Sequence, residues 1–205
     1  MFKKFPSLNQ LYLSNNKINQ IEADSFYKLS KMNVLKIDYN NLTGLNNMIF
    51  FGGITNLTDS LYLNNNYLSQ IETYTFEQFD MIQYIDISFN QLQQVDLNTF
   101  TGLVNLKTFK LNNNLISAIA DNSFTTLSQL IEIDLSYNRL SSINKGTFNG
   151  LNSIEKIFLQ SNQIVSFDVD SLSSLNKLQT IDVDNNPNIP TTYTITPCLS
   201  RNFYF

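Results

Sequence analysis

Glu132 and Asp134 are the residues with the clearest capacity for chemistry, because they stand two positions apart in segment 131–135. In an extended strand such residues point to the same face, so the two carboxylates would lie side by side. A carboxylate pair could in principle act as general acid and general base. That work needs a closed pocket that shifts one pKa, whereas the surrounding sequence predicts an open, hydrated sheet. We therefore expect no catalytic residue and no enzymatic activity.

The composition excludes most metal and thiol chemistry. The 205 residues include no His and a single Cys, Cys198. This removes His-based triads, His metal sites and any disulfide within the chain. The acids of the expected sheet lie on different strands, with no Asp-rich loop of the EF-hand kind to gather Ca²⁺. We expect no metal site and no cofactor, and we favour a buried or incidental Cys198 over a reactive or intermolecular thiol.

The charge balance limits the partners. The formal net charge is −4 and the pI is near 4.7, which argues against a nucleic-acid binder because such proteins are normally basic. No segment reaches the roughly 18 to 20 apolar residues of a membrane helix. Lys3 and Lys4 are not followed by the apolar core of a signal peptide. The sequence therefore predicts no nucleic-acid partner and shows neither a membrane segment nor a signal peptide.

An internal repeat of 24 residues supplies the elements that position these side chains. Eight copies start at Leu8, Met32, Thr58, Ile82, Leu106, Leu130, Ile154 and Leu178, and the step from Met32 to Thr58 is 26 residues long. Position 9 of every copy is Asn: Asn16, Asn40, Asn66, Asn90, Asn114, Asn138, Asn162 and Asn186. Position 19 is Phe26, Phe76, Phe100, Phe124 and Phe148, with Leu172 in the seventh copy. Apolar residues recur at fixed spacings between them.

This pattern resembles the leucine-rich repeat, L-x-x-L-x-L-x-x-N-x-L, from Leu8 to about Ile189. The 24-residue period with Phe at position 19 is similar to the "typical" subclass of extracellular proteins and receptor ectodomains, including Toll-like receptors. The resemblance implies an α/β-type horseshoe solenoid of about eight repeats, dominated by short parallel strands, with little regular helix on the convex side. It also implies a non-catalytic, protein-binding role and an extracellular or cell-surface location.

Elementary geometry supports the same architecture. Positions 3 to 7 of each copy alternate in polarity, which predicts a short strand with positions 4 and 6, such as Leu11 and Leu13, pointing inward. One strand cannot bury its own apolar face, so the copies must stack into a parallel sheet. The Asn residues would satisfy backbone groups where the chain leaves the sheet, and the Phe residues would form a spine. The stretch after position 14 is too short for a regular helix.

Positions 3, 5 and 7 of the copies form the predicted concave face, where we expect a protein partner to bind. Six acids and three bases fall there, so the face carries most of the net charge of −4. Exposed aromatic residues flanked by charge are typical of interface hot spots. The candidate binding residues are Tyr12, Lys36, Asp38, Tyr62, Tyr84, Asp86, Lys110, Glu132, Asp134 and Phe158, and further aromatic residues follow at position 8, namely Tyr39, Phe89 and Tyr137. Alternatively, these residues stabilise the sheet, with Lys110 in an ion-pair ladder between Asp86 and Asp134.

Residues 1–205 are predicted to form one solenoid, in which residues 8–189 hold the eight copies. Residues 1–7 are a partial repeat or a minimal cap, because Phe2 and Phe5 match Phe26 and Leu29 at an offset of 24. We expect the chain to begin inside a longer protein. Residues 190–205 are predicted to be a C-terminal cap or tail that folds back over the last copy.

Two local features concern the convex side and the compartment. The second copy loses its pattern after Leu45, and we interpret the stretch from Asn46 to Ile54, which contains Phe50, Phe51, Gly52 and Gly53, as a bulged convex loop with no chemistry. Asn41 and Asn56 open Asn-x-Thr sequons, which makes them candidate N-glycan sites and weak evidence for secretion.

Our leading hypothesis is a recognition module that binds a protein partner, with a basic protein among the candidates, on its concave face, as part of an extracellular receptor-like, adhesion or innate-immune protein. The alternative is an intracellular leucine-rich-repeat scaffold or regulatory subunit in the cytoplasm. The absence of paired cysteines and of a visible signal peptide supports that alternative.

Overall fold

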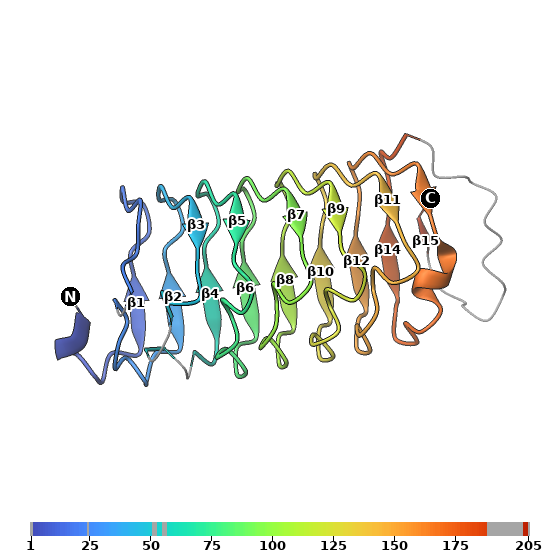
Figure 1. Ribbon diagram of the computed structural model, residues 1–205. Coiled ribbons are helices and arrows are strands. Elements are labelled where there is room, and N and C mark those ends of the chain that lie inside the picture. The colour runs from blue at the N-terminus through green and yellow to red at the C-terminus, as the bar shows by residue number, and fades with distance from the viewer. Residues whose placement is uncertain (1, 24, 51–52, 55–56, 188–202, 205) are drawn as a thin grey trace.

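A nine-stranded parallel sheet runs the length of the molecule (Figure 1). The structure, a computed structural model, describes residues 2–23, 25–50, 53–54, 57–187 and 203–204. In spatial order the strands are β1 (Gln10–Tyr12), β2 (Val34–Lys36), β4 (Ser60–Tyr62), β6 (Tyr84–Asp86), β8 (Thr108–Lys110), β10 (Glu132–Asp134), β12 (Lys156–Phe158), β14 (Thr180–Asp182) and β15 (Phe203–Tyr204). The first eight occupy positions 3 to 5 of the eight copies and pair in register. The predicted solenoid of short parallel strands is confirmed.

The alternation within the strands holds with two exceptions. The central residue of each of the eight strands from β1 to β14 is buried, as in Leu35 and Ile133, which have no exposed surface. At position 3, however, Val34 and Ser60 are buried although we predicted that they face outward. Ser60 is a small residue set between Val34 and Tyr84 on the adjacent strands, and these larger neighbours shield it. At β2 and β4 the concave face therefore exposes fewer side chains than the sequence pattern predicts.

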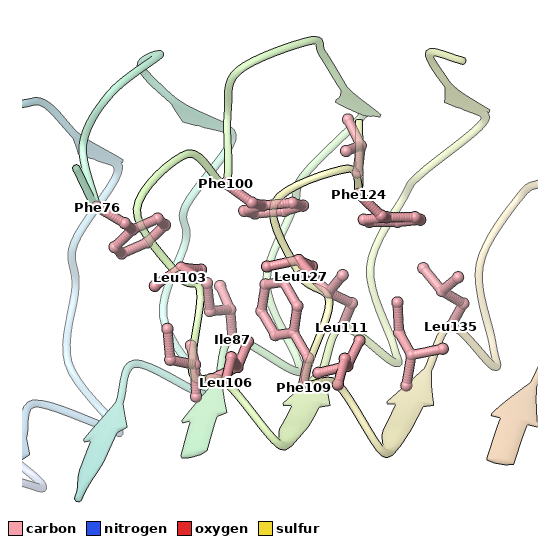
Figure 2. Packing of buried hydrophobic residues seen from close by; sticks show 14 of the residues in the cluster. Phe76, Ile87, Phe100, Leu103, Leu106, Phe109, Leu111, Phe124, Leu127 and Leu135 are labelled. Carbon is pink, nitrogen blue, oxygen red and sulfur yellow. The ribbon is translucent and has the colours of Figure 1, made fainter. Parts of the chain in front are cut away.

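A spine of phenylalanines fills the interior behind the sheet, as predicted, and Phe50 belongs to it. The ring centroids lie 6.0 Å apart between Phe26 and Phe50, 6.5 Å between Phe50 and Phe76, and 6.1 Å between Phe100 and Phe124. Figure 2 shows the rings of Phe76, Phe100 and Phe124 in one row above the leucines of the core. The predicted spine did not include Phe50, which lies in a turn and is buried at position 19 of its copy, as the other spine residues are.

The extra length of the second copy changes the start of the third. The backbone N–H of Leu57 donates to the carbonyl of Ile54, as that of Ile82 donates to Phe79. Leu57 therefore fills the buried first position of its copy, and Thr58 is an extra residue beside it. The predicted start of the copy at Thr58 is off by one residue, because the leucine takes the interior place.

The asparagines of position 9 form a hydrogen-bonded ladder. Asn90 Nδ2 donates to the carbonyls of Leu63, Ile87 and Ser88 at 3.0, 3.1 and 3.1 Å, and its Oδ1 accepts from Leu68 N at 2.9 Å. The five asparagines from Asn66 to Asn162, like Asn40, are buried. Each amide thus joins its own turn to the preceding copy and satisfies backbone groups that would otherwise be buried without a partner.

Six shorter strands line the opposite side of the coil: β3 (Gly44–Leu45), β5 (Gln70–Ile71), β7 (Gln94–Val95), β9 (Ala118–Ile119), β11 (Ser142–Ile143) and β13 (Ser166–Phe167). They pair only two by two, as β3–β5, β7–β9 and β11–β13. Every pair of adjacent strands in the main sheet is hydrogen-bonded, whereas alternate neighbours among the six short strands are not paired and form open steps. The main sheet therefore lies on the shorter, concave side. The two 3₁₀ helices within the described residues, η1 (Phe2–Lys4) and η2 (Val169–Leu172), agree with the predicted scarcity of regular helix.

Glycines hold the convex loops together at two of the open steps. Gly102 (φ 102°) and Gly150 (φ 92°) pack against the backbone near Phe76 and Phe124, where an added Cβ would clash. At the same step as Gly102, Tyr74 N donates to the carbonyl of Asn98 at 3.2 Å. These close glycine contacts thus lie at steps where the short strands do not pair. Gly102 and Gly150 are 48 residues apart, which is the length of two copies.

The two ends differ in how much of them the structure describes. At the N-terminal end, Phe5 N donates to the carbonyl of Phe2, the same bond that Leu29 makes with Phe26. At the C-terminal end, β15 extends the sheet beside β14. Cys198, Asn56 and most of the predicted cap at 190–205 lie outside the described residues. Within them, no helix has the length and apolar character that a membrane crossing requires.

Candidate functional site

The concave face gathers most of the ten candidate residues into two clusters. The tyrosine–lysine cluster consists of Tyr12, Lys36, Tyr62 and Tyr84 on β1, β2, β4 and β6. The ion-pair network consists of Lys110, Glu132, Asp134 and Lys156 on β8, β10 and β12. Register in the sheet brings them together, because residues of one position lie opposite each other on adjacent strands, as Lys36 lies opposite Tyr62. The two clusters succeed one another along the face.

Lys36 is held between aromatic rings in the tyrosine–lysine cluster. Its Nζ lies 4.5 Å from the ring centroid of Tyr62 and 5.6 Å from that of Tyr12. The Tyr62 and Tyr84 rings follow at a centroid distance of 5.2 Å. Lys36 forms no ion pair with any described residue, so ring faces rather than a carboxylate accompany its charge. Tyr12 is 59% exposed, which leaves one side of this cluster open to a partner.

The ion-pair network centres on Glu132. Its two carboxylate oxygens contact Lys110 Nζ at 2.7 Å and Lys156 Nζ at 3.4 Å, and Lys110 Nζ also lies 3.7 Å from Asp134. Burial raises the pKa of Glu132, but the hydrogen bonds and charges of the two lysines outweigh it and leave this pKa below its ordinary value. Lys110 Nζ also lies 5.9 Å from the ring centroid of Phe158. Both carboxylates are thus paired with lysine, which does not suit them for acid–base catalysis.

The expected ladder from Asp86 through Lys110 to Asp134 forms only in part. Lys110 pairs with Asp134, as predicted, but its shortest contact is with Glu132, and it forms no ion pair with Asp86. Asp86 instead accepts from Ser88 N at 2.9 Å and Ser88 Oγ at 2.6 Å. Ser88, two residues later, thus satisfies the carboxylate of Asp86 within the same copy. The spacing of charges along the sheet does not reveal this local preference. Asp134 makes the same bonds with Ser136.

Tyr84 and Asp38 complete the set of candidate residues. Burial, followed by the negative charge of Asp86, raises the pKa of the Tyr84 phenol well above its ordinary value. This phenol therefore stays protonated at neutral pH. Asp38 stands apart from both clusters and accepts from Ser14 Oγ at 2.5 Å. The sequence analysis left Lys156 outside the candidate set, although its position on a strand next to Glu132 was a usable signal.

Hollows of the surface and groups of acidic side chains bear on what the concave face can do. Two hollows of the described surface lie away from it, and the larger of these, lined by Ser69–Thr73 and by Gln93, Gln94 and Asp96, marks the open step between β5 and β7. Among the described residues no group of three His, Cys, Asp or Glu side chains converges to hold a metal ion. The concave face offers ring faces, the Lys36 ammonium group without an ion pair among the described residues, and both paired and unpaired carboxylates on an open sheet.

Comparison with known proteins decides the family. The family model described as Leucine rich repeat matches residues 6–59, 55–116, 104–164 and 132–187. The chain belongs to the leucine-rich-repeat family. Among solved structures, this leucine-rich-repeat chain is similar to the crystal structure of a TLR13–ssRNA13 complex, with a TM-score of 0.83 and 27% identity over 89% of its length. It spans only 26% of that chain, and no curated protein sequence matches it.

Proposed function

We propose that this leucine-rich-repeat solenoid is a non-catalytic recognition module that binds a protein partner on its concave face. The observation that carries the proposal is the tyrosine–lysine cluster, in which the 59% exposed Tyr12 adjoins a lysine without an acid partner among the described residues. Aromatic residues and unpaired charge are what anchor protein interfaces. Tyrosine also loses little side-chain entropy on binding and keeps a polar tip for hydrogen bonds.

The ion-pair network sets the second part of the proposed interface. Its lysines pair with Glu132 and Asp134, while Asp86, which lies opposite Lys110 in the sheet, forms no ion pair with any described residue. The concave face carries six acids and three bases, so a negative electrostatic potential extends along the sheet. Such a field steers and selects a partner that carries basic groups.

The compartment is part of the same proposal. Similarity to a TLR13 structure and the Phe spine support an extracellular, receptor-like protein. Asn41 is exposed, as a glycosylated asparagine must be. The test is the mass of the protein from its native source: a glycan at Asn41 supports this location, and an unmodified cytoplasmic protein supports the alternative of an intracellular scaffold.

The binding test begins with a panel of purified extracellular and cytoplasmic proteins, together with a single-stranded RNA, because the similar TLR13 structure contains one. For each molecule bound, the affinity of the wild-type chain is compared with that of the combined variant Tyr62→Ala, Tyr84→Ala and Asp86→Ala. The matched control is Tyr27→Ala and Lys145→Ala, at exposed positions outside the concave face. We expect the first variant to weaken protein binding at least tenfold and the control to leave it unchanged. Protein binding that survives the first variant, or binding of RNA alone, contradicts the proposal.

A further inference from the structure

A row of aromatic side chains stands along one margin of the concave face. The residues at position 8 directly follow the sheet, and a backbone ladder joins them to the next copy: Tyr39 N donates to Asn64 O, Phe89 N to Asn112 O, and Tyr137 N to Gln160 O. All three residues have φ of 53°. Identical backbone conformation in one register points their side chains in the same direction. We call Tyr39, Phe89 and Tyr137 the aromatic row.

The aromatic row adopts an unfavourable backbone conformation without a visible benefit to the stability of the fold. A positive φ is strained for residues with bulky side chains and is tolerated by Asn. The copies between them place Asn65 and Asn113 at this position, with φ of 55° and 56°. The rings of Tyr39, Phe89 and Tyr137 are nevertheless 52%, 51% and 55% exposed. Strain retained three times for exposed rings indicates a role outside the folded chain.

The spacing of the row restricts what can lie on it. The rings recur at every second copy, and strands in a sheet are about 4.8 Å apart, so neighbouring rings of the row stand about 9.6 Å apart. A polyproline II helix presents one residue of every three to a given side and rises about 3.1 Å per residue, which gives about 9.3 Å per turn. An extended β-strand presents every second residue at about 6.8 Å and does not fit.

The asparagines between the rings distinguish the remaining geometries. The side-chain amides of Asn65 and Asn113 form no hydrogen bond with any described residue and are not fully buried. In an α-helix, seven residues span about 10.5 Å, but the backbone carbonyls are already used within the helix. The carbonyls of a polyproline II helix have no internal partner and can accept from such amides. Alternating rings and amides therefore suit that conformation on both counts.

The carboxylates beside the aromatic row favour basic residues in the ligand. A carboxylate of the concave face precedes each ring by one to three residues: Asp38 before Tyr39, Asp86 before Phe89, and Asp134 before Tyr137. Asp38 and Asp86 form no ion pair with any described residue. A ligand on the row thus gains from lysine or arginine at the positions that turn toward the sheet.

We propose that the aromatic row binds a proline-rich, basic segment of the protein partner in the polyproline II conformation. This inference rests on the proposed protein-binding function and names the chemistry of the partner. Prolines at every third residue pack against Tyr39, Phe89 and Tyr137, the amides of Asn65 and Asn113 donate to the free carbonyls, and basic side chains face the acids. Aromatic residues recognise proline-rich segments in this way because the ligand is already ordered before binding.

The test uses the peptide (Pro-Pro-Lys)₄ as the probe, titrated into the full chain by calorimetry. The variant combines Tyr39→Asn, Phe89→Asn and Tyr137→Asn, the residue that alternate copies already carry at position 8. The matched control is Tyr74→Asn: Tyr74 is also exposed, with φ of 62°, and Asn98 and Asn122 hold the equivalent place in the next two copies on the convex side. We expect the triple variant to unfold at the same or a higher temperature than the wild type, which excludes misfolding. It should bind the peptide at least tenfold more weakly, while Tyr74→Asn changes the affinity less than twofold.

Three results would overturn the inference. The wild type could show no binding of (Pro-Pro-Lys)₄ at millimolar concentration, or the triple variant could bind it as the wild type does. A lysine-rich helical peptide with leucine at every seventh residue, or a linear β-glucan, could also bind through the row more tightly than the proline peptide. The combination Tyr62→Ala and Tyr84→Ala, measured against the protein partner, separates this outcome from failure of the proposed function, because it alters the concave face and leaves the row intact.

Discussion

Gly102 lies directly against the backbone carbonyl of Phe76 on the preceding copy, where no Cβ could fit. The residue has φ of 102°, so both its conformation and its surroundings require glycine. The contact closes the convex side at a step where the short strands β5 and β7 do not pair. Gly102 and Phe76 thus form one of the two kinds of contact that join neighbouring copies on the convex side.

Replacing Gly102 tests this contact. Gly102→Ala should lower the free energy of unfolding by about 3 kcal/mol, because the added methyl group clashes with the backbone and strains the positive φ. Gly44→Ala is the matched control, since the nearest atoms to an added Cβ there lie 3.9 Å away. It should be neutral or slightly stabilising. Urea unfolding of both variants measures the difference, and equal effects would show that the close contact is not needed.

The asparagine ladder predicts a dependence on position along the chain. Asn90→Ala should cost about 3 kcal/mol, because three carbonyls and one N–H lose their partner in a buried site. Asn16→Ala should cost about 1 kcal/mol, since Asn16 is exposed and bonds only the carbonyls of Leu13 and Ser14 in its own copy. Chemical unfolding measures both. A loss at Asn16 equal to that at Asn90 would argue against the role of burial.

Phe50 provides a test of the spine at its least regular copy. Phe50→Ala should lower the free energy of unfolding by about 3 to 5 kcal/mol, because it removes a buried ring that contacts Phe26, Phe76 and Phe79. The control Phe5→Ala removes a ring that is 58% exposed and should cost less than about 1 kcal/mol. Thermal unfolding compares the two. A small loss at Phe50 would argue against its place in the spine.

Phe50 also shows where prediction from sequence succeeds and where it stops. The register of Asn and Phe predicted the solenoid, the ladder and the spine, because buried positions tolerate few residue types. The two extra residues of the second copy follow Phe50, which keeps its offset of 24 from Phe26, and they displace the apparent start of the third copy to Thr58. The pairing of Lys110 with Glu132 depends on side-chain reach and on the local Ser88 bonds of Asp86, which residue spacing does not encode. The pairing of the convex strands two by two, with glycine contacts at steps between the pairs, does not follow from the sequence pattern.

The ion-pair network predicts a pH-dependent contribution from Glu132. Its pKa in the native state lies below the ordinary value of 4.5, so the carboxylate adds stability above that value. The contribution is lost as the pH falls through the lowered native pKa. Glu132→Gln should therefore destabilise the protein by about 0.5 to 1 kcal/mol at pH 7 and by nothing at a pH below the native pKa.

Asp170→Asn is the control for Glu132→Gln. Asp170 contacts Lys145 at 3.1 Å, but its side chain is 60% exposed and water screens the pair. Its replacement should leave stability unchanged at both pH values. The measurement is urea unfolding at pH 7 and pH 3. An effect of Glu132→Gln that does not shrink in acid would mean that lost packing, rather than charge, is responsible.

Photo-crosslinking from single positions tests the central claim, that the concave face binds a protein. A benzophenone amino acid replaces Tyr12 or Tyr62 on the concave face in one set of chains, and the exposed Tyr27 outside that face in another. Each chain is expressed in the native source, irradiated and analysed by mass spectrometry. The account predicts one discrete protein adduct from Tyr12 and Tyr62 and none from Tyr27. Adducts from Tyr27 alone, or the same adducts from all three positions, would contradict it.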